Sequence, residues 1–425
     1  MSFETIKGYK EVKDEFELLK NLCSYRENLD SHGIMIPDSL LLYGPEGMGK
    51  KFMAEEFVKE LPYESFTFTA DDDCDSQRKE FHAFIDATDT EKLYLINIEG
   101  IDKIAAMQGG EGLGMLSEFL DLDLYGANFF VIATADKKDE IPESFFHDQL
   151  FERSVCVAYP DLGDVTEMYE SIIQKKNLVM EVSVENASSI FFRNRYREIE
   201  SIIDMAAAKT LIASKGQMPE DGKLHISEEC FMNAVLEREY DSPTEVLNDE
   251  EELFKVALHE AGHIIAGELV QPGCVGYASI RTGTKDEREG FTARCADWNV
   301  ERIKQAVYSL AGKAAVELRY GADTNGSSSD IDKAIENLVY DVYTDGIKGL
   351  SLVILRHLDD ESETLKAKQE DAVYALLNEA YRLASHIVSR NAEPLEALAR
   401  ALMKKTWLLH SEIREILTGY TLREE

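Results

Sequence analysis

The chain has 425 residues and a mass of 48.0 kDa, and its 44% hydrophobic and 30% charged residues are typical of a globular protein with two or three domains. With 81 acidic and 45 basic side chains, its net charge of −36 repels nucleic acid and anionic lipid. No stretch has the length and apolarity of a membrane span or the pattern of a secretion signal, and the six cysteines follow neither disulfide nor zinc-finger spacing. We expect a cytoplasmic protein with reduced thiols and no nucleic-acid partner.

Five short apolar runs alternate with segments of helical pattern between residues 39 and 159. The runs cover residues 40–43, 66–68, 93–96, 129–132 and 155–157. Runs that are apolar on both faces and separated by helices are typical of a parallel sheet covered on both sides. We therefore predict a doubly wound α/β domain over residues 1–160.

A glycine-rich turn follows the first apolar run and precedes a helical pattern. It consists of Gly44, Pro45, Glu46, Gly47, Met48, Gly49, Lys50 and Lys51. Between a strand and a helix, such a turn lets backbone N–H groups and a lysine, here Lys50, hold the phosphates of ATP or ADP. A plain glycine turn is the alternative interpretation.

Two features of this turn weaken a magnesium site. Lys51 stands where a Ser or Thr hydroxyl would bind the metal, and Glu46 adds negative charge near the phosphates. At the end of the third apolar run, Glu99 stands where a magnesium-binding Asp is usual, and Gly100 where a water-activating carboxylate is usual. We predict a loop that binds nucleotide, with an impaired magnesium site and little or no ATP hydrolysis.

The remainder of the chain changes to helical periodicity. Residues 161–240 predict a small helical domain, and the polar, proline-containing stretch 241–248 predicts a linker. Residues 249–425 predict a mostly α domain, with short strands near residues 274–281 and 290–295.

The strongest chemical signal is the run His259-Glu260-Ala261-Gly262-His263 within an apolar helical segment. Residues four apart share one face of a helix, so the two imidazoles can bind one zinc ion with Glu260 beside it. Because zinc lowers the pKa of water, Glu260 can serve as general base and acid in peptide hydrolysis. A buried helix with two hydrogen-bonded histidines is the alternative, but it leaves Glu260 unexplained.

Zinc needs a third protein ligand, and spacing alone does not identify it. Asp330 follows a run of serines at a predicted helix start, and Glu317 lies on a preceding helix. The structural alternatives are a first-turn carboxylate that interacts with the helix dipole and a solvated charge on a helix face. The residues themselves leave both candidates open.

Taken in this order, the motifs resemble those of the FtsH family of AAA+ zinc metalloproteases over almost the whole chain. The matching segments are residues 3–13, 36–37, 44–50, 197–209, 259–263, 310–318, 326–330 and 401–405. The resemblance implies that Asp330 is the third zinc ligand and that the substrates are unfolded or flexible proteins. It also implies that an extended peptide adds to the strand at residues 290–295 and that the chain forms a homo-hexamer.

The chain also departs from the family pattern. The α/β domain begins almost at residue 1, which predicts a member without a transmembrane anchor. Asp136 stands where the family has a sensor asparagine. His147 and Leu150 occupy the positions where the family has arginine fingers. The acidic segment 70–77 stands where the pore loop is expected and lacks its aromatic-glycine element. We therefore expect a degenerate AAA+ domain that neither hydrolyses ATP efficiently nor threads folded proteins. A working ATP-dependent motor and a non-catalytic ring scaffold are the alternative functions.

Overall fold

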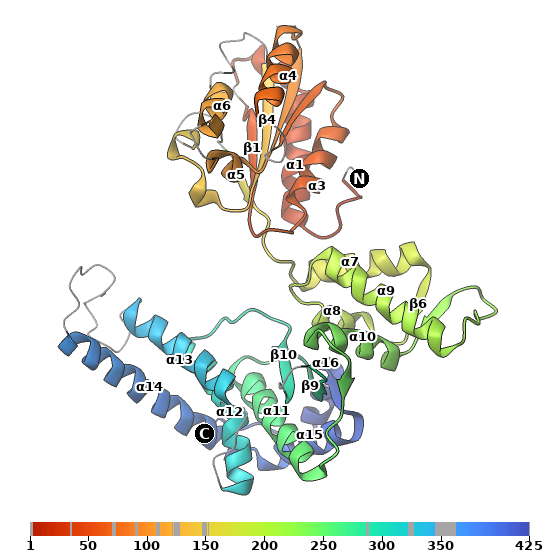
Figure 1. The fold of residues 1–425 in the computed structure, drawn as a ribbon, viewed down its shortest axis with the longest axis vertical. Helices are drawn as coiled ribbons and strands as arrows, with labels where there is room; N and C mark the ends of the chain where they lie inside the picture. Colours follow the sequence, from red (N-terminus) through yellow and green to blue (C-terminus); the bar gives the residue numbers. More distant parts are fainter. Residues whose placement is uncertain are drawn as a thin grey trace. The chain divides into compact units, whose positions relative to one another are not determined.

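The chain forms two compact units in a computed structural model (Figure 1). The first unit comprises residues 1–168 and 193–195, and the second comprises residues 169–192 and 196–425, so most of the predicted helical domain 161–240 groups with the second unit. The residues that the structure describes are 3–34, 36–69, 74–89, 92–107, 111–120, 122, 128–146, 151, 153–285, 289–321, 327–344 and 363–424.

A parallel sheet forms the centre of the first unit. Its strands are β1 (Ser39–Tyr43), β2 (Ser65–Thr69), β3 (Leu93–Glu99), β4 (Asn128–Ala135) and β5 (Ser154–Cys156). They lie in the order β2-β3-β4-β1-β5, and each neighbouring pair is parallel. The α/β architecture and the five strands predicted from the apolar runs are confirmed. The carboxyl ends of β1, β3 and β4 meet at one edge of the sheet.

Helices cover both faces of this sheet (Figure 1). Their bounds are α1 (Lys10–Ser24), α2 (Arg26–Asp30), α3 (Lys50–Glu60), α4 (Cys74–Asp86), α5 (Ile101–Ala105) and α6 (Glu111–Leu120), with 3-10 turns at Lys138–Glu140 and Glu143–Phe145. Alternate residues of β1 enter separate cores: Leu40 and Leu42 pack with α1 and α3, whereas Leu41 packs with α4, α5 and α6. Burial on both faces explains why the strands are continuous apolar runs.

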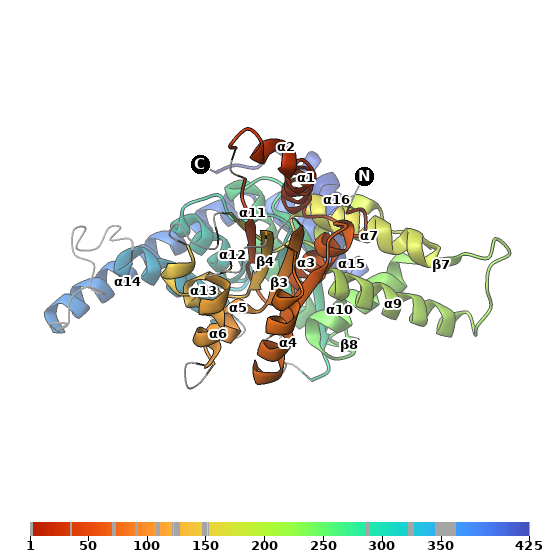
Figure 2. The same ribbon diagram turned by 90° about the horizontal axis from the view of Figure 1, so that it is seen from above.

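Helices predominate in the rest of the chain. Their bounds are α7 (Leu162–Lys176), α8 (Val184–Ile190), α9 (Tyr196–Ala213), α10 (Glu228–Tyr240), α11 (Glu250–Val270), α12 (Arg302–Tyr320), α13 (Ser328–Tyr343), α14 (Glu363–Arg390), α15 (Ala392–Lys405) and α16 (His410–Thr418). Figures 1 and 2 show α13 lying alongside the long α14, and the two helices pack together.

A small antiparallel sheet accompanies the helices of the second unit. It consists of β8 (Thr244–Glu245), β9 (Val275–Gly283), β10 (Glu289–Arg294) and β11 (Trp407–Leu409), while β6 (Leu178–Met180) and β7 (Leu224–Ile226) form a separate parallel pair. Strand β9 pairs with each of the other three strands. The two strands predicted near residues 274–281 and 290–295 are confirmed as β9 and β10. The predicted linker, residues 241–248, contributes β8 to this sheet.

Helix α11 lies at the centre of the second unit, where it packs against α12, α15 and β9. The Asp249 carboxylate caps its first turn by accepting hydrogen bonds from the backbone N–H groups of Glu251 and Glu252, at 2.9 and 3.2 Å. Three glutamates in that turn also stabilise the helix, because their negative charges lie at the positive end of the helix dipole. Because the helix is apolar on almost every side, its middle turns are buried.

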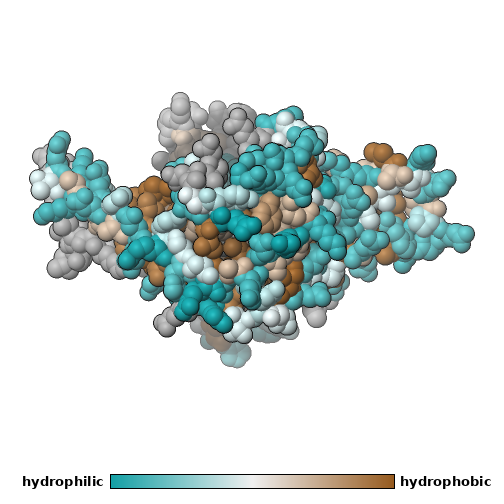
Figure 3. All heavy atoms as spheres, turned by 90° about the horizontal axis from the view of Figure 1, so that it is seen from below, coloured by the Kyte–Doolittle hydropathy of each residue, from teal (hydrophilic) through white to brown (hydrophobic). Residues whose placement is uncertain are grey.

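Figure 3 shows the distribution of polar and apolar residues on one face of the molecule. The face drawn in Figure 3 is mostly hydrophilic, with hydrophobic residues in small groups, as the high share of charged residues leads one to expect. Among the helices of the described ranges, none has the length and apolar composition that crossing a bilayer requires.

Candidate metal centre and nucleotide loop

Three side chains from two helices of the second unit converge on one point. His259 and His263 lie one turn apart on α11, with their Nε2 atoms 3.0 Å from each other. The Oδ2 atom of Asp330, in the first turn of α13, lies 3.0 Å from Nε2 of His259 and 3.2 Å from Nε2 of His263. Within the described ranges, these residues are the one group of three His, Cys, Asp or Glu side chains placed to hold a metal ion.

The geometry of this group fits zinc. Ligand atoms on a tetrahedral zinc ion are separated by about 3.3 Å, because each lies about 2.0 Å from the metal. The observed separations of 3.0–3.2 Å are close to that value. The Nδ1 atom of His263 lies 2.8 Å from the backbone carbonyl oxygen of Tyr308, to which it donates its hydrogen. This hydrogen bond leaves the Nε2 lone pair of His263 available to a metal.

The charges of the three groups depend on one another. Burial opposes a charge on His263, but the hydrogen bond to Asp330 and its negative charge outweigh burial and raise the pKa of His263. Burial also opposes a charge on Asp330, but the two histidines hold the pKa of that carboxyl well below its usual range. Asp330 is therefore ionised at neutral pH, and an ionised carboxylate is the kind of oxygen ligand that a divalent cation prefers.

A glycine of the neighbouring helix α12 makes room for the histidines. A Cβ atom at Gly312 would lie 2.6 Å from the Nε2 atoms of both His259 and His263. Any larger residue would therefore clash with both imidazoles. The sequence contains a signal for this position that our predictions did not use, because a glycine inside a helix is unfavourable unless close packing requires it.

Glu260 lies next to this group and is buried, with 3% of its surface exposed. Its Oε2 atom accepts a hydrogen bond of 2.7 Å from the hydroxyl of Thr292 on β10. Burial raises the pKa of Glu260, although the neighbouring histidines and Thr292 oppose this effect. A buried carboxylate with a raised pKa suits the uptake and return of a proton. Neither Thr292 nor Tyr308 was predicted, since no sequence motif marks them.

The other predicted zinc ligand, Glu317, lies outside the group. Its carboxylate pairs with the ammonium of Lys313 at 2.7 Å and accepts a hydrogen bond from the hydroxyl of Tyr381. Its carboxylate is thus engaged with Lys313 and Tyr381. Of the two candidates, the structure therefore brings only Asp330 to His259 and His263.

The predicted nucleotide loop lies in the first unit, between β1 and α3. The turn itself contains Gly44, Pro45, Glu46, Gly47, Met48 and Gly49, while Lys50 and Lys51 begin α3 and Glu99 ends β3. Met48 is buried in the core beneath the loop, whereas Glu46 is exposed. The arrangement of strand, turn and helix is therefore the predicted one.

Each lysine of the loop is paired with a carboxylate of the first unit. The buried ammonium of Lys50 lies 2.8 Å from Oδ1 of Asp136 and donates to the carbonyl oxygens of Gly44 and Pro45, both at 2.7 Å. The ammonium of Lys51 lies 2.7 Å from Oε2 of Glu99. The predicted positions His147 and Leu150, and residues 70–73 of the predicted pore-loop segment, fall outside the described residues.

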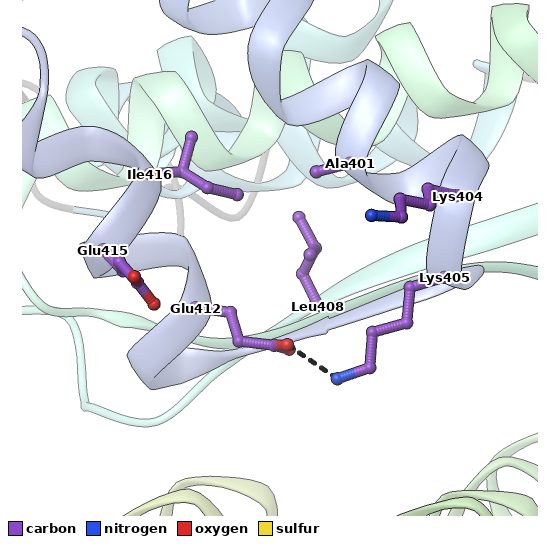
Figure 4. A pocket seen from close by; sticks show the side chains of 7 residues that line it. All are labelled: Ala401, Lys404, Lys405, Leu408, Glu412, Glu415 and Ile416. Atoms are coloured by element: carbon purple, nitrogen blue, oxygen red, sulfur yellow. Dashed lines mark hydrogen bonds and ion pairs between the residues drawn. The ribbon is translucent and has the colours of Figure 1, made fainter.

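A separate shallow pocket lies between α15 and α16 (Figure 4). The ammonium of Lys405 and the carboxylate of Glu412 form an ion pair of 2.6 Å at its edge. The lining residues are Ala401, Lys404, Lys405, Leu408, Glu412, Glu415 and Ile416. None of them belongs to the candidate metal centre, so the pocket is a separate feature of the surface.

Comparison with known proteins identifies two regions of the chain. Residues 245–416 match peptidase family M41, and residues 40–159 match the ATPase family associated with various cellular activities (AAA). The M41 region includes both histidines, Glu260 and Asp330, and the AAA region includes the nucleotide loop.

Nearly the whole chain is also similar to proteins described as ATP-dependent zinc metalloproteases. It is 22% identical to FtsH of Ureaplasma parvum over 97% of this chain and 60% of that protein. It is 23% identical to FtsH 1 of Thermoanaerobacter sp. over 99% of this chain and 73% of that protein, and 23% identical to the chloroplastic FTSH 2 of Oryza sativa over 99% and 66%. The chain thus spans between 60% and 73% of the length of these relatives.

Proposed function

Because the chain belongs to the FtsH family of AAA+ zinc metalloproteases, we propose that its second unit is a zinc-dependent endopeptidase that cleaves unfolded or flexible proteins. One observation carries the proposal. His259, His263 and Asp330 direct three donor atoms to one point, and the buried carboxylate of Glu260 lies beside them. Paired histidines with a neighbouring acid are the residues that metal-assisted peptide hydrolysis requires.

Each of these residues has its own role in the hydrolysis. His259, His263 and Asp330 would hold a zinc ion, which would supply a Lewis acid able to polarise a peptide carbonyl and to lower the pKa of water. Glu260 accepts the proton of the attacking water and returns it to the leaving amine. The hydroxyl of Thr292 holds Oε2 of Glu260 in place, and the carbonyl of Tyr308 keeps His263 in the tautomer that exposes Nε2.

The position of β10 supports an extended peptide as the substrate. Among the strands of the described ranges, β10 pairs with β9 alone, so it is an edge strand of the kind to which an extended peptide adds. The same strand carries Thr292, which contacts Glu260. A peptide that adds to β10 would therefore pass near the catalytic carboxylate, and only a flexible segment can adopt this form.

The first unit, in this proposal, binds ATP or ADP and hydrolyses ATP slowly or not at all. Gly100 offers no carboxylate to activate water, and both lysines of the loop are engaged with carboxylates. A working motor is the second candidate. It predicts ATP-stimulated degradation of a folded substrate that Lys50→Ala abolishes, whereas our proposal predicts cleavage of unfolded substrates that ATP does not stimulate.

The decisive experiment measures bound zinc and the cleavage of a permanently unfolded protein. We expect about one zinc ion per chain, and we expect Glu260→Gln to reduce cleavage about 100-fold or more while zinc stays bound. Glu252→Gln is the matched control, since Glu252 is an exposed residue of α11 that pairs with Lys255. Equal cleavage by Glu260→Gln and the unchanged chain would reject the mechanism, and absent cleavage with bound zinc would favour the scaffold function.

We also propose that the chain forms a homo-oligomer, which the family resemblance suggests is a hexamer. Light scattering of the full chain tests this point independently of catalysis. A mass equal to that of a single chain at micromolar concentration would contradict it.

A further inference from the structure

The ion pair between Lys51 and Glu99 joins the start of α3 to the end of β3, which are the two positions that usually hold a magnesium ion in a phosphate-binding loop. Lys51 is the second residue of α3 and Glu99 is the last residue of β3. The side chain of Lys51 is 60% exposed, whereas that of Glu99 is 8% exposed. The lysine therefore extends from the surface of the loop to a buried carboxylate, whose other oxygen accepts a hydrogen bond of 3.3 Å from Asn97.

Magnesium does not fit these residues. In phosphate-binding loops the ion is held by a Ser or Thr hydroxyl at the start of the helix and by an acid at the end of a neighbouring strand. Here the hydroxyl is replaced by the ammonium of Lys51, which lies 2.7 Å from the acid. A magnesium ion would have to displace this ammonium and would gain no hydroxyl ligand in exchange.

We propose that Lys51 replaces magnesium as the counter-ion of a bound nucleotide, so that the first unit takes ADP or ATP in its metal-free form. This inference rests on the nucleotide binding proposed above for the first unit, and it adds the ionic form of the ligand. The ammonium of Lys51 is part of the protein, it neutralises Glu99, and it extends from the first turn of α3, where the phosphates of a bound nucleotide would lie.

The pairing of Asp136 allows Lys50 to contribute to the same site. The Oδ1 atom of Asp136 lies 2.8 Å from the ammonium of Lys50, and the Oδ2 atom of Asp136 lies 3.0 Å from the ammonium of Lys103. When Lys50 turns toward a phosphate, Asp136 therefore keeps a cationic partner and is not left as an unpaired charge. The backbone N–H of Asp136 also donates to the carboxylate of Asp102 at 2.9 Å, which holds the segment in position.

A third cation borders the loop. The guanidinium of Arg195 lies so close to Gly47 that a Cβ atom at that glycine would be 2.7 Å from Nη1 of Arg195. Lys50, Lys51 and Arg195 thus supply positive charge around the turn without a divalent ion. Planar guanidinium and flexible ammonium groups are both effective partners of phosphate oxygens.

The test measures the affinity of the zinc-loaded full chain for ADP by calorimetry, in magnesium-free buffer and again with added magnesium. We expect the dissociation constant of the unchanged chain to differ by less than about threefold between the two buffers. We expect Lys51→Met to weaken metal-free binding about tenfold, which is the loss of one charge-assisted contact. We expect Lys51→Thr, which restores a hydroxyl, to bind ADP about tenfold more tightly with magnesium than without it.

Lys59→Thr is the matched control, because Lys59 is an exposed residue of the same helix that pairs only with surface glutamates in the described structure. We expect it to leave both dissociation constants unchanged. If the single variants unfold, Lys51→Met combined with Glu99→Gln avoids an unpaired buried carboxylate, and we expect the same tenfold loss.

Two results would overturn the inference. One is a tenfold or greater tightening of ADP binding by magnesium in the unchanged chain, and the other is no ADP binding in either buffer. Neither result bears on the second unit, because cleavage of an unfolded protein by the same preparations is measured without nucleotide. Failure of this inference is therefore distinguishable from failure of the proposed peptidase.

Discussion

The candidate metal centre of the second unit and the nucleotide loop of the first unit both place carboxylates beside nitrogen-containing side chains, but in opposite arrangements. At the metal centre, the Nε2 atoms of His259 and His263 and Oδ2 of Asp330 are all potential electron-pair donors, and they lie 3.0–3.2 Å apart. At the nucleotide loop, the cations Lys50 and Lys51 each contact a carboxylate within 2.8 Å. The first cluster has the donor atoms that could hold a divalent cation, whereas each carboxylate of the second already pairs with a lysine.

This difference separates the expected effects of substitution. Changes at the metal centre are expected to alter zinc content and cleavage, with small effects on folding. Changes at the nucleotide loop are expected to alter the stability of the first unit, because its ion pairs are part of the folded structure.

Gly312→Ala is expected to abolish zinc binding and cleavage. Its Cβ atom would lie 2.6 Å from Nε2 of both His259 and His263, so the imidazoles would have to separate. We expect a loss of cleavage of about 1,000-fold, because metal and general base no longer act together. Metal analysis and the cleavage assay measure the effect. Gly419→Ala is the control, because its Cβ atom would make only an ordinary contact at 3.6 Å. If Gly312→Ala retained its zinc, α12 would have to be able to move aside.

Asp330→Ala and Glu317→Ala are expected to behave differently, although both remove a carboxylate once considered as the third ligand. Asp330→Ala should weaken zinc binding about 100-fold or more, since it removes a charged ligand. Glu317→Ala should keep its zinc and lose about 1 kcal/mol of unfolding free energy, because it removes only the contacts with Lys313 and Tyr381. Competition with a zinc indicator measures both affinities. The opposite ranking of the two affinities would exclude Asp330 as the third ligand.

Thr292→Val is expected to reduce kcat about tenfold without changing zinc content. The substitution keeps the shape of the side chain but removes the hydroxyl that donates to Oε2 of Glu260 at 2.7 Å, so the carboxylate loses its orientation. Thr292→Ser restores a hydroxyl and should recover most of the rate. If Thr292→Val lowered kcat and bound zinc together, Thr292 would support the metal centre rather than orient Glu260.

The same contrast shows why some features of the sites were predictable from the sequence and others were not. The proximity of His259 and His263 follows from helical periodicity alone, and the five strands of the first unit follow from their apolar runs. Asp330 lies on another helix, 67 residues beyond His263, and only the family resemblance singled it out. The carbonyl of Tyr308 is a backbone group, which no residue pattern can mark.

The pairs at the nucleotide loop illustrate a further limit. The sequence marked Lys51, Glu99 and Asp136 as separate departures from a motif, but it did not show that Lys51 pairs with Glu99 and that Asp136 pairs with Lys50. Their proximity depends on the strand order β3-β4-β1, which brings the carboxyl ends of three strands to one edge of the sheet. Strand order is a property of the tertiary fold, and it has no signature in the local sequence.

Asp136→Asn is expected to have the smallest effect, no more than about 0.5 kcal/mol of unfolding free energy in the first unit at pH 7, because its carboxylate is partly exposed. Burial opposes the charge of Asp136, but the hydrogen bonds and charges of Lys50 and Lys103 outweigh it and lower the pKa of the carboxyl below the ordinary 3.8. A lowered pKa stabilises the fold above the ordinary value, and this contribution is lost as the pH falls through the folded-state pKa. The difference between Asp136→Asn and the unchanged chain should therefore be full at pH 7 and shrink below about pH 3.8.

Urea denaturation at pH 7 and pH 3 measures this difference. Both tryptophans, Trp298 and Trp407, lie in the second unit, so the transition seen by circular dichroism but not by tryptophan fluorescence belongs to the first unit. Asp139→Asn is the control, because Asp139 is exposed, and we expect it to change stability at neither pH. If Asp136→Asn were as stable as the unchanged chain at pH 7, the carbonyl oxygens of Gly44 and Pro45 would suffice to hold Lys50. The ion pair with Asp136 would then not be needed for the stability of the loop, and this part of the difference from the metal centre would be wrong.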